Sequence, residues 1–160
     1  MLVSFDNLSD EARVWIYPSS RPFRDNEVSE ITQKLSAFLA QWTAHGASLQ
    51  AGFTMPYNRF IVIALDQNEQ AATGCSIDSS VHFIQELEKE FDVVLLDKMN
   101  VSFKQGEYIT YKPLADFKAL VKNKSVTENT PVFNHLVLNK REFLAEWEVP
   151  AKDSWHARYF

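Results

Sequence analysis

Two strand-like segments joined by a three-residue turn limit the folds open to this chain more than any other feature. Phe60-Ile-Val-Ile-Ala-Leu65 is continuously apolar, which is typical of a β-strand buried on both faces. Residues 49–55 form a second strand of mixed polarity, and only Pro56-Tyr57-Asn58 separates the two. So short a connection allows an antiparallel hairpin but no parallel crossover, so a parallel α/β sheet is disfavoured.

An amphipathic helix precedes this hairpin. Residues 28–42 place apolar side chains at helical spacing. Asp25 or Asn26 is the expected N-cap, because a short side-chain oxygen can accept a bond from a free amide of the first turn. Gly46 is the expected stop, since glycine tolerates the left-handed conformation that ends many helices.

A second amphipathic helix follows the hairpin, with apolar side chains spaced over residues 77–91. Short strands are expected at 14–17, before the first helix, and at 93–96, after the second. The order is therefore β-α-β-β-α-β, which predicts an α+β fold built on a ferredoxin-like sandwich.

The rest of the chain extends this sandwich. A hairpin is expected over 101–103 and 108–111, a helix over 114–121, a strand over 132–138 and a short helix over 142–147. The aromatic segment 154–160 is expected to pack on the body or on a partner. With 160 residues and no repeat or linker, the chain predicts a single domain over 1–160.

Composition excludes several classes of protein. The net charge of -5 disfavours nucleic-acid binding, which needs cations against phosphates. The single cysteine excludes an intrachain disulfide. The first residues lack the pattern of a signal peptide, and no run approaches the roughly 20 apolar residues of a membrane span. We therefore expect a cytoplasmic protein.

Topology brings two polar segments to one edge of the predicted sandwich. The first helix leaves at Trp42–Gly46, and the second begins near Thr73–Asp78. Because the first helix and the hairpin's second strand run in the same direction, both exits should meet. Free amides at a helix start favour negative charge and would activate the Cys75 thiol. His45 could serve as its base, so Cys75 and His45 are the candidate catalytic residues.

The same edge could instead bind a ligand without reacting. An anion at a helix start needs only free amides, and Gly74 would let it approach closely. Asp78 and His82 are four residues apart and could hydrogen-bond on one helical face. The candidate ligand-binding residues are Gly74, Cys75, Ser76, Asp78, Ser79, His82 and His45.

A simpler interpretation competes for each of these residues. A lone cysteine is most often a small buried apolar side chain. Ser76 or Asp78 would then be the N-cap of the second helix, and His45 would close the first. None of the four histidines has a partner at the close spacing of zinc sites, so we expect neither a metal nor another cofactor.

Three motifs give the chain a resemblance to a known family. Gln41-Trp-Thr-Ala-His-Gly46, Gly74-Cys-Ser-Ile-Asp78 and Ser154-Trp-His156 resemble those of a family of short bacterial proteins, often labelled "ABC transporter ATPase". The resemblance covers nearly the whole chain. The label implies nucleotide hydrolysis, but the Gly-x-x-x-x-Gly-Lys-Ser/Thr phosphate loop is absent, and so is the Ser-Gly-Gly transporter signature.

The sequence thus predicts a small ligand- or protein-binding domain and no P-loop ATPase. Its expected partner is a small anion or another protein, and the aromatic segment 154–160 is compatible with a homodimer. The alternative is a thiol-dependent enzyme or redox sensor that uses Cys75 with His45.

Overall fold

The computed structural model describes every residue from Met1 to Phe160, and these form two compact units. The first unit is Met1–Leu96 with Leu138–Arg141, and the second is Asp97–Val137 with Glu142–Phe160. Helices pack beside antiparallel sheets, which confirms the α+β class. No helix combines the length and apolar character needed to cross a membrane. The single domain stays a prediction, and each unit is described by itself.

The first unit is built on the predicted hairpin. Strands β4 (Gln50–Thr54) and β5 (Phe60–Asp66) pair antiparallel across the turn Pro56–Asn58. Strand β1 (Arg13–Pro18) pairs antiparallel with the other edge of β5, so the order is β1-β5-β4. Every side chain from Phe60 to Leu65 is buried, as the apolar run predicts.

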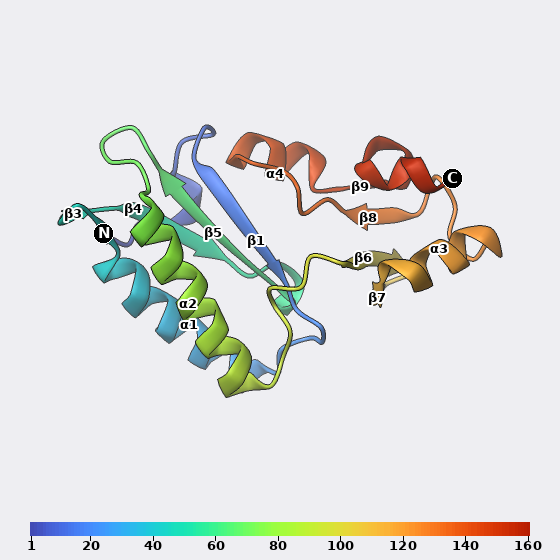
Figure 1. The fold of residues 1–160 in the computed structure, drawn as a ribbon, viewed down its shortest axis with the longest axis horizontal. Coiled ribbons are helices and arrows are strands. Elements are labelled where there is room, and N and C mark those ends of the chain that lie inside the picture. The colour runs from blue at the N-terminus through green and yellow to red at the C-terminus, as the bar shows by residue number, and fades with distance from the viewer. The chain divides into compact units, whose positions relative to one another are not determined.

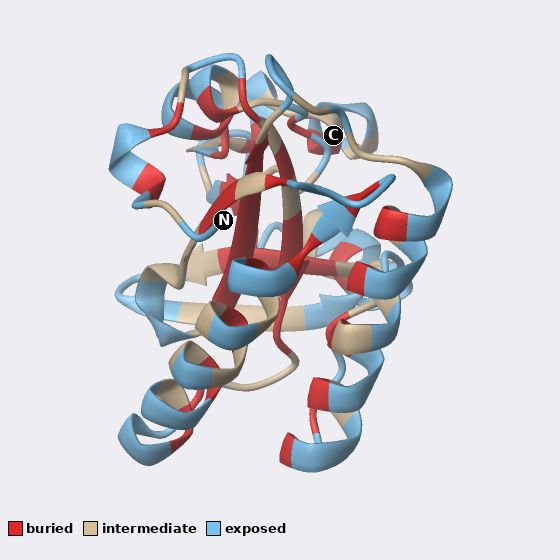
Figure 2. Ribbon diagram, turned by 90° about the vertical axis from the view of Figure 1, so that its left-hand side faces the viewer, coloured by how far each residue is buried: buried red, intermediate tan, exposed pale blue.

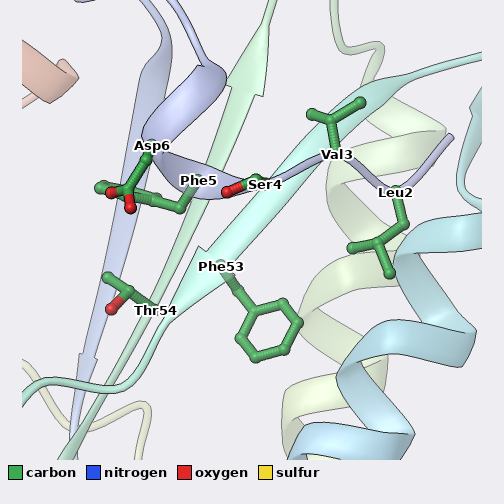
Figure 3. Close-up of a pocket in the computed structure, with 7 residues that line it drawn as sticks. All are labelled: Leu2, Val3, Ser4, Phe5, Asp6, Phe53 and Thr54. Carbon is green, nitrogen blue, oxygen red and sulfur yellow. The ribbon is translucent and has the colours of Figure 1, made fainter.

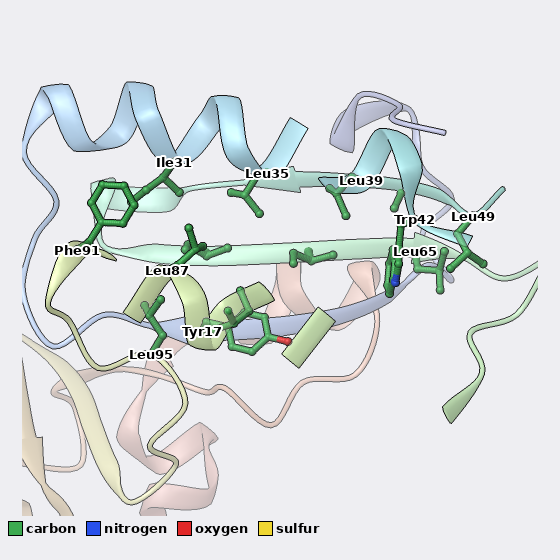
Figure 4. Packing of buried hydrophobic residues seen from close by; sticks show 14 of the residues in the cluster. Tyr17, Ile31, Leu35, Leu39, Trp42, Leu49, Leu65, Leu87, Phe91 and Leu95 are labelled. Carbon is green, nitrogen blue, oxygen red and sulfur yellow. The ribbon is translucent and has the colours of Figure 1, made fainter. Parts of the chain in front are cut away.

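Two helices, α1 (Asp25–Gln41) and α2 (Gly74–Phe91), cover one face of this sheet (Figure 1). Apolar residues of α1 point at the strands in Figure 4, and α2 supplies the same kind of side chain. The solvent-facing sides of both helices stay exposed, whereas the strands are largely buried (Figure 2). The main packing residues are Tyr17, Ile31, Leu35, Leu39, Ile61, Ile63, Leu65, Ile84, Leu87 and Phe91.

The expected fourth strand of the sandwich does not form. Residues Val93–Leu96 are irregular, and the Ser20 amide donates to the Val94 carbonyl at 3.1 Å. The free edge of β1 is met instead by a distant segment, since the Val14 amide donates to the Leu138 carbonyl at 3.0 Å. The ferredoxin-like order therefore stays a prediction, since β1 bonds here to residues 138 and 139 and not to the expected strand.

One ion pair ties the start of α1 to the end of α2. The Arg21 guanidinium makes two 2.8 Å bonds to the Glu27 carboxylate and a 2.6 Å bond to the Phe91 carbonyl. Glu27 also accepts the Arg24 amide at 2.9 Å, so Glu27 satisfies the helix start that Asp25 or Asn26 was expected to cap. The bonds from Arg21 and from that amide lower the pKa of Glu27 to about 2.

A buried lysine ties residues 138–141 to the N-terminal residues of the first unit. Lys140 is only 6% exposed, and its ammonium donates to the carbonyls of Phe5, Asp6 and Leu8 at 2.8–3.1 Å. Three carbonyl dipoles replace the water that the charge loses on burial. Lys140 lies at the start of helix α4 (Lys140–Glu146), which the sequence predicts at nearly the same place.

The second unit contains a separate sheet of order β7-β6-β8-β9. The predicted hairpin and the helix after it are confirmed, but the strand expected over 132–138 ends at Phe133. The elements are β6 (Asn100–Gln105), β7 (Tyr108–Pro113), α3 (Leu114–Lys122), β8 (Pro131–Phe133) and β9 (Glu148–Pro150).

Lowering the pH should reduce the unfolding free energy of the protein through protonation of Glu27. Its folded pKa of about 2 lies below the ordinary value of 4.5, so its contribution is complete above pH 4.5 and is lost as the pH falls toward 2. We expect a loss of up to about 3 kcal/mol in unfolding free energy, since one pKa unit corresponds to about 1.4 kcal/mol. Urea unfolding from pH 6 to about pH 2 measures it.

The Glu27→Gln variant should be less stable than the parent at neutral pH and should lose most of this pH dependence. Glu30→Gln is the matched control, because Glu30 is exposed on the same helix. If the unfolding free energy of Glu27→Gln depends on pH as strongly as that of the parent, other groups cause the acid sensitivity.

Candidate functional site

Helix α2 starts with a reciprocal cap. The Thr73 hydroxyl accepts the Ser76 amide at 3.2 Å, and the Ser76 hydroxyl accepts the Thr73 amide at 2.7 Å. Thr73 is therefore the N-cap, and the prediction of Ser76 or Asp78 is wrong. Ser76 instead occupies the third helical position and closes the capping box, where a glutamate or glutamine is more usual.

The two residues inside this cap are open to solvent. Cys75 is exposed, so the simpler interpretation of a buried thiol is wrong. A Cβ atom on Gly74 would meet nothing within 4 Å, so the protein itself imposes no steric need for glycine here. Exposure of both residues leaves the first turn of α2 accessible.

The exit of α1 lies against this turn, as the topology predicts. The Trp42 indole N–H donates to the Ser76 carbonyl at 2.9 Å, and both residues are only 3% exposed. Trp42 directly follows the last residue of α1. The bond thus joins the end of one helix to the start of the other, across 34 residues of sequence.

His45 does not pair with Cys75. A hairpin, β2 (Thr43–Ala44) and β3 (Ala47–Ser48), follows α1, and His45 and Gly46 form its two-residue turn. Their φ angles are 52° and 77°, the positive values that type I′ turns require. Gly46 therefore serves this turn and does not stop the helix. His45 is exposed, with no hydrogen bond or ion pair to the thiol.

The remaining candidates lie along the exposed side of α2. The His82 ring lies 3.2 Å from the Glu86 carboxylate, one turn further along, and does not pair with Asp78 as expected. The Ser79 hydroxyl donates to the Ser76 carbonyl at 2.8 Å. No three His, Cys, Asp or Glu side chains gather where they could hold a metal ion.

A groove runs between α1 and α2 and reaches the candidate site. Two cavities, of about 310 and 280 Å³, share Phe38 and Gln41, and the second extends to Ser79 on α2. We call them together the helix groove. Its lining is Lys34, Ala37, Phe38, Gln41, Trp42, Thr43, Ser79, Phe83, Glu86, Leu87 and Glu90.

Two aromatic rings form the floor of the helix groove. Phe38 and Phe83 stack with their ring centres 4.5 Å apart and their planes inclined by 6°. Phe38 also lies 5.8 Å from the Trp42 ring, so the aromatic surface continues to the capped start of α2. Both phenylalanines are only half-buried, which leaves apolar area in contact with water.

A larger cavity of the first unit lies elsewhere. It measures about 460 Å³ and sits where residues 2–6 leave the edge of β4 (Figure 3). Asp6 is its only ionisable side chain, and it contains no residue that the sequence selected. Its lining is Leu2, Val3, Ser4, Phe5, Asp6, Phe53 and Thr54.

The Ser154-Trp-His156 motif belongs to the core of the second unit. The Ser154 hydroxyl lies 2.8 Å from His156 Nδ1, and His156 is fully buried beside the ring of Phe117. Burial lowers the pKa of His156 to about 3, with a smaller contribution from the charge of His135. The aromatic segment therefore packs on the body, one of the two expected outcomes.

Sequence reasoning did not select Phe83 as a site residue, and it used Gln41 only as the first residue of a resemblance motif. The apolar periodicity contains Phe38, which the sequence assigns to the buried stripe, but periodicity alone does not show which stripe members stay half-exposed. Phe83 directly precedes the buried Ile84, and that position at the margin of the stripe is the one available signal.

Comparison with known proteins adds no relative: no protein-family model, curated protein or solved structure matches this chain. The resemblance based on the three motifs therefore stays a prediction.

Removing the indole donor should loosen the site. Trp42→Phe keeps an aromatic ring but leaves the Ser76 carbonyl without its bond from α1, so we expect a loss of about 1–3 kcal/mol in unfolding free energy. Hydrogen exchange should also accelerate in the first turns of α2. Trp15→Phe is the control, since Trp15 lies edge-on to Trp42 but makes no bond to α2. Equal effects of the two substitutions would contradict a specific role for the bond.

Proposed function

We propose that this protein is a binding module whose contact surface is the helix groove and the adjoining start of α2. The half-exposed Phe38 and Phe83 stack carries this proposal. Aromatic anchors with a polar surround are typical of surfaces that bind proteins or apolar ligands.

The chemistry of the groove supports binding by a side chain with an apolar body. The floor offers two flat rings, and the rim offers charged groups through Lys34, Glu86 and Glu90. At the far end, beside Trp42, the Ser79 hydroxyl adds a polar margin. A partner could therefore bury an aromatic or aliphatic anchor and keep its polar atoms at the rim.

Binding is favoured over catalysis because it needs only shape and charge, which the groove supplies. A thiol-dependent reaction needs a base within hydrogen-bond reach, and Cys75 has none.

The ferredoxin-like fold, the cytoplasmic location and the bacterial source of the protein are part of the same proposal. The order β1-β5-β4 with two helices on one face supports a ferredoxin-like first unit that lacks the fourth strand. One unpaired cysteine supports a reducing, cytoplasmic setting. The motif resemblance supports a bacterial source.

A fragment that mimics one aromatic side chain tests the groove. We expect N-acetyltryptophan amide, titrated into ¹⁵N-labelled protein, to shift the amide signals of residues 34–43 and 79–90 most strongly. Phe83→Gln should remove these shifts, because it replaces one ring of the floor.

Phe53→Gln is the matched control, since Phe53 is another half-buried phenylalanine that lines the cavity of Figure 3. It should leave the shifts unchanged. Shifts centred on residues 2–6 and 53–54 would instead place binding at that cavity and refute the helix groove.

Exposure of Cys75 keeps thiol chemistry as the second candidate. Its test is the rate of alkylation by iodoacetamide between pH 5 and about pH 10. An apparent pKa at or above about 8.5, the ordinary thiol value, would remove the enzyme and redox-sensor hypotheses. A clearly lower value that rises in His45→Gln would support them.

A further inference from the structure

The charged residues that line the helix groove differ in sign between its two sides. Lys34 lies on the α1 side of the helix groove, and Glu86 and Glu90 lie on the α2 side. Lys34 bridges to Glu90 at 3.1 Å, with the two side chains 41% and 45% exposed. An exposed pair of this kind contributes little stability, so its partners can be exchanged at small cost.

The stacked rings lie beside this ion pair, with Phe38 one turn along α1 from Lys34. Phe38 comes from α1 and Phe83 from α2, so each helix contributes one ring. The two helices run antiparallel, because the start of α1 is tied to the end of α2 by Arg21 and the end of α1 to the start of α2 by Trp42. The helix groove therefore has a cation on its α1 side, two carboxylates on its α2 side, and an aromatic pair next to the ion pair.

This arrangement is complementary to itself. A two-fold axis along the seam between the helices would place α1 of one copy over α2 of the other. Lys34 of each copy would then meet Glu86 and Glu90 of its partner, and each Phe38 would lie over a Phe83. One symmetry operation thus pairs the opposite charges and covers all four rings.

We propose that the occupant of the helix groove is a second copy of this chain, which forms a symmetric dimer through α1 and α2. This inference rests on the proposed function, because it names the partner of the same surface. Two helices about 26 Å long and together about 20 Å wide offer roughly 500 Å² per copy, from standard helix dimensions. Interfaces of that size are weak, so the dimer should dissociate on dilution.

Sedimentation velocity over a wide concentration range tests the dimer. The parent should shift from monomer to dimer as its concentration rises. Lys34→Glu should weaken self-association about tenfold or more, because like charges then face each other twice across the axis. The double variant Glu86→Lys with Glu90→Lys should do the same.

Mixing these two variants provides the decisive measurement. In a mixed dimer every charged contact between the two copies is again between opposite signs, so the mixture should associate more tightly than either variant alone. Lys89→Glu is the control, since Lys89 is exposed on α2 outside the groove and makes the same change of charge. Lys89→Glu should dimerise like the parent.

A parent that stays monomeric at every concentration would overturn the dimer, and so would a mixture that fails to associate. Binding of N-acetyltryptophan amide to the groove separates the two proposals. If the amide binds there while the parent stays monomeric, the self-association is wrong and the binding surface stands. If the amide binds elsewhere and the parent is monomeric, both are wrong.

Discussion

The hydrogen bonds of Arg21 to Glu27 and to the Phe91 carbonyl are the constraint on which the helix pair depends. They fasten the start of α1 to the end of α2, and the indole of Trp42 fastens the opposite ends through the Ser76 carbonyl. With both ends tied, the sides of the helices that face away from the sheet are held at a constant separation. The Phe38–Phe83 stack and the helix groove exist because of that separation.

The same two ties explain why an apolar surface can persist in water. Closer approach of the helices would bury Phe38 and Phe83, but the buried side chains of both helices already pack on the strands, and the helix pair is bonded at both ends. The rings therefore cover each other and leave one side exposed. Apolar area that stays in contact with water can gain free energy by contact with another molecule, which is the physical argument for the proposed binding surface.

Sequence reasoning succeeded where the cause is local. The hairpin follows from a three-residue turn and the burial of β5 from an unbroken apolar run, and both are confirmed. The predicted N-cap of α2 was wrong, because a cap depends on which of several nearby side-chain oxygens reaches a free amide. The Thr73 oxygen reaches the amide, and the Asp78 oxygen does not. The predicted strand at 93–96 does not form, because residue 138, more than 40 positions away, bonds to the edge of β1 instead.

The sequence by itself determined that the end of α1 and the start of α2 would meet, because helical periodicity and a short hairpin leave few topologies. The tertiary structure decided which side chains make contact where the two helix ends meet. It placed His45 in the turn of a hairpin, with no bond to Cys75, and joined the two segments through Trp42 and Ser76 instead. It also brought Phe38 and Phe83 together, although neither was selected as a site residue. Side-chain partners separated by tens of residues are set by the packing of whole elements, which local pattern does not contain.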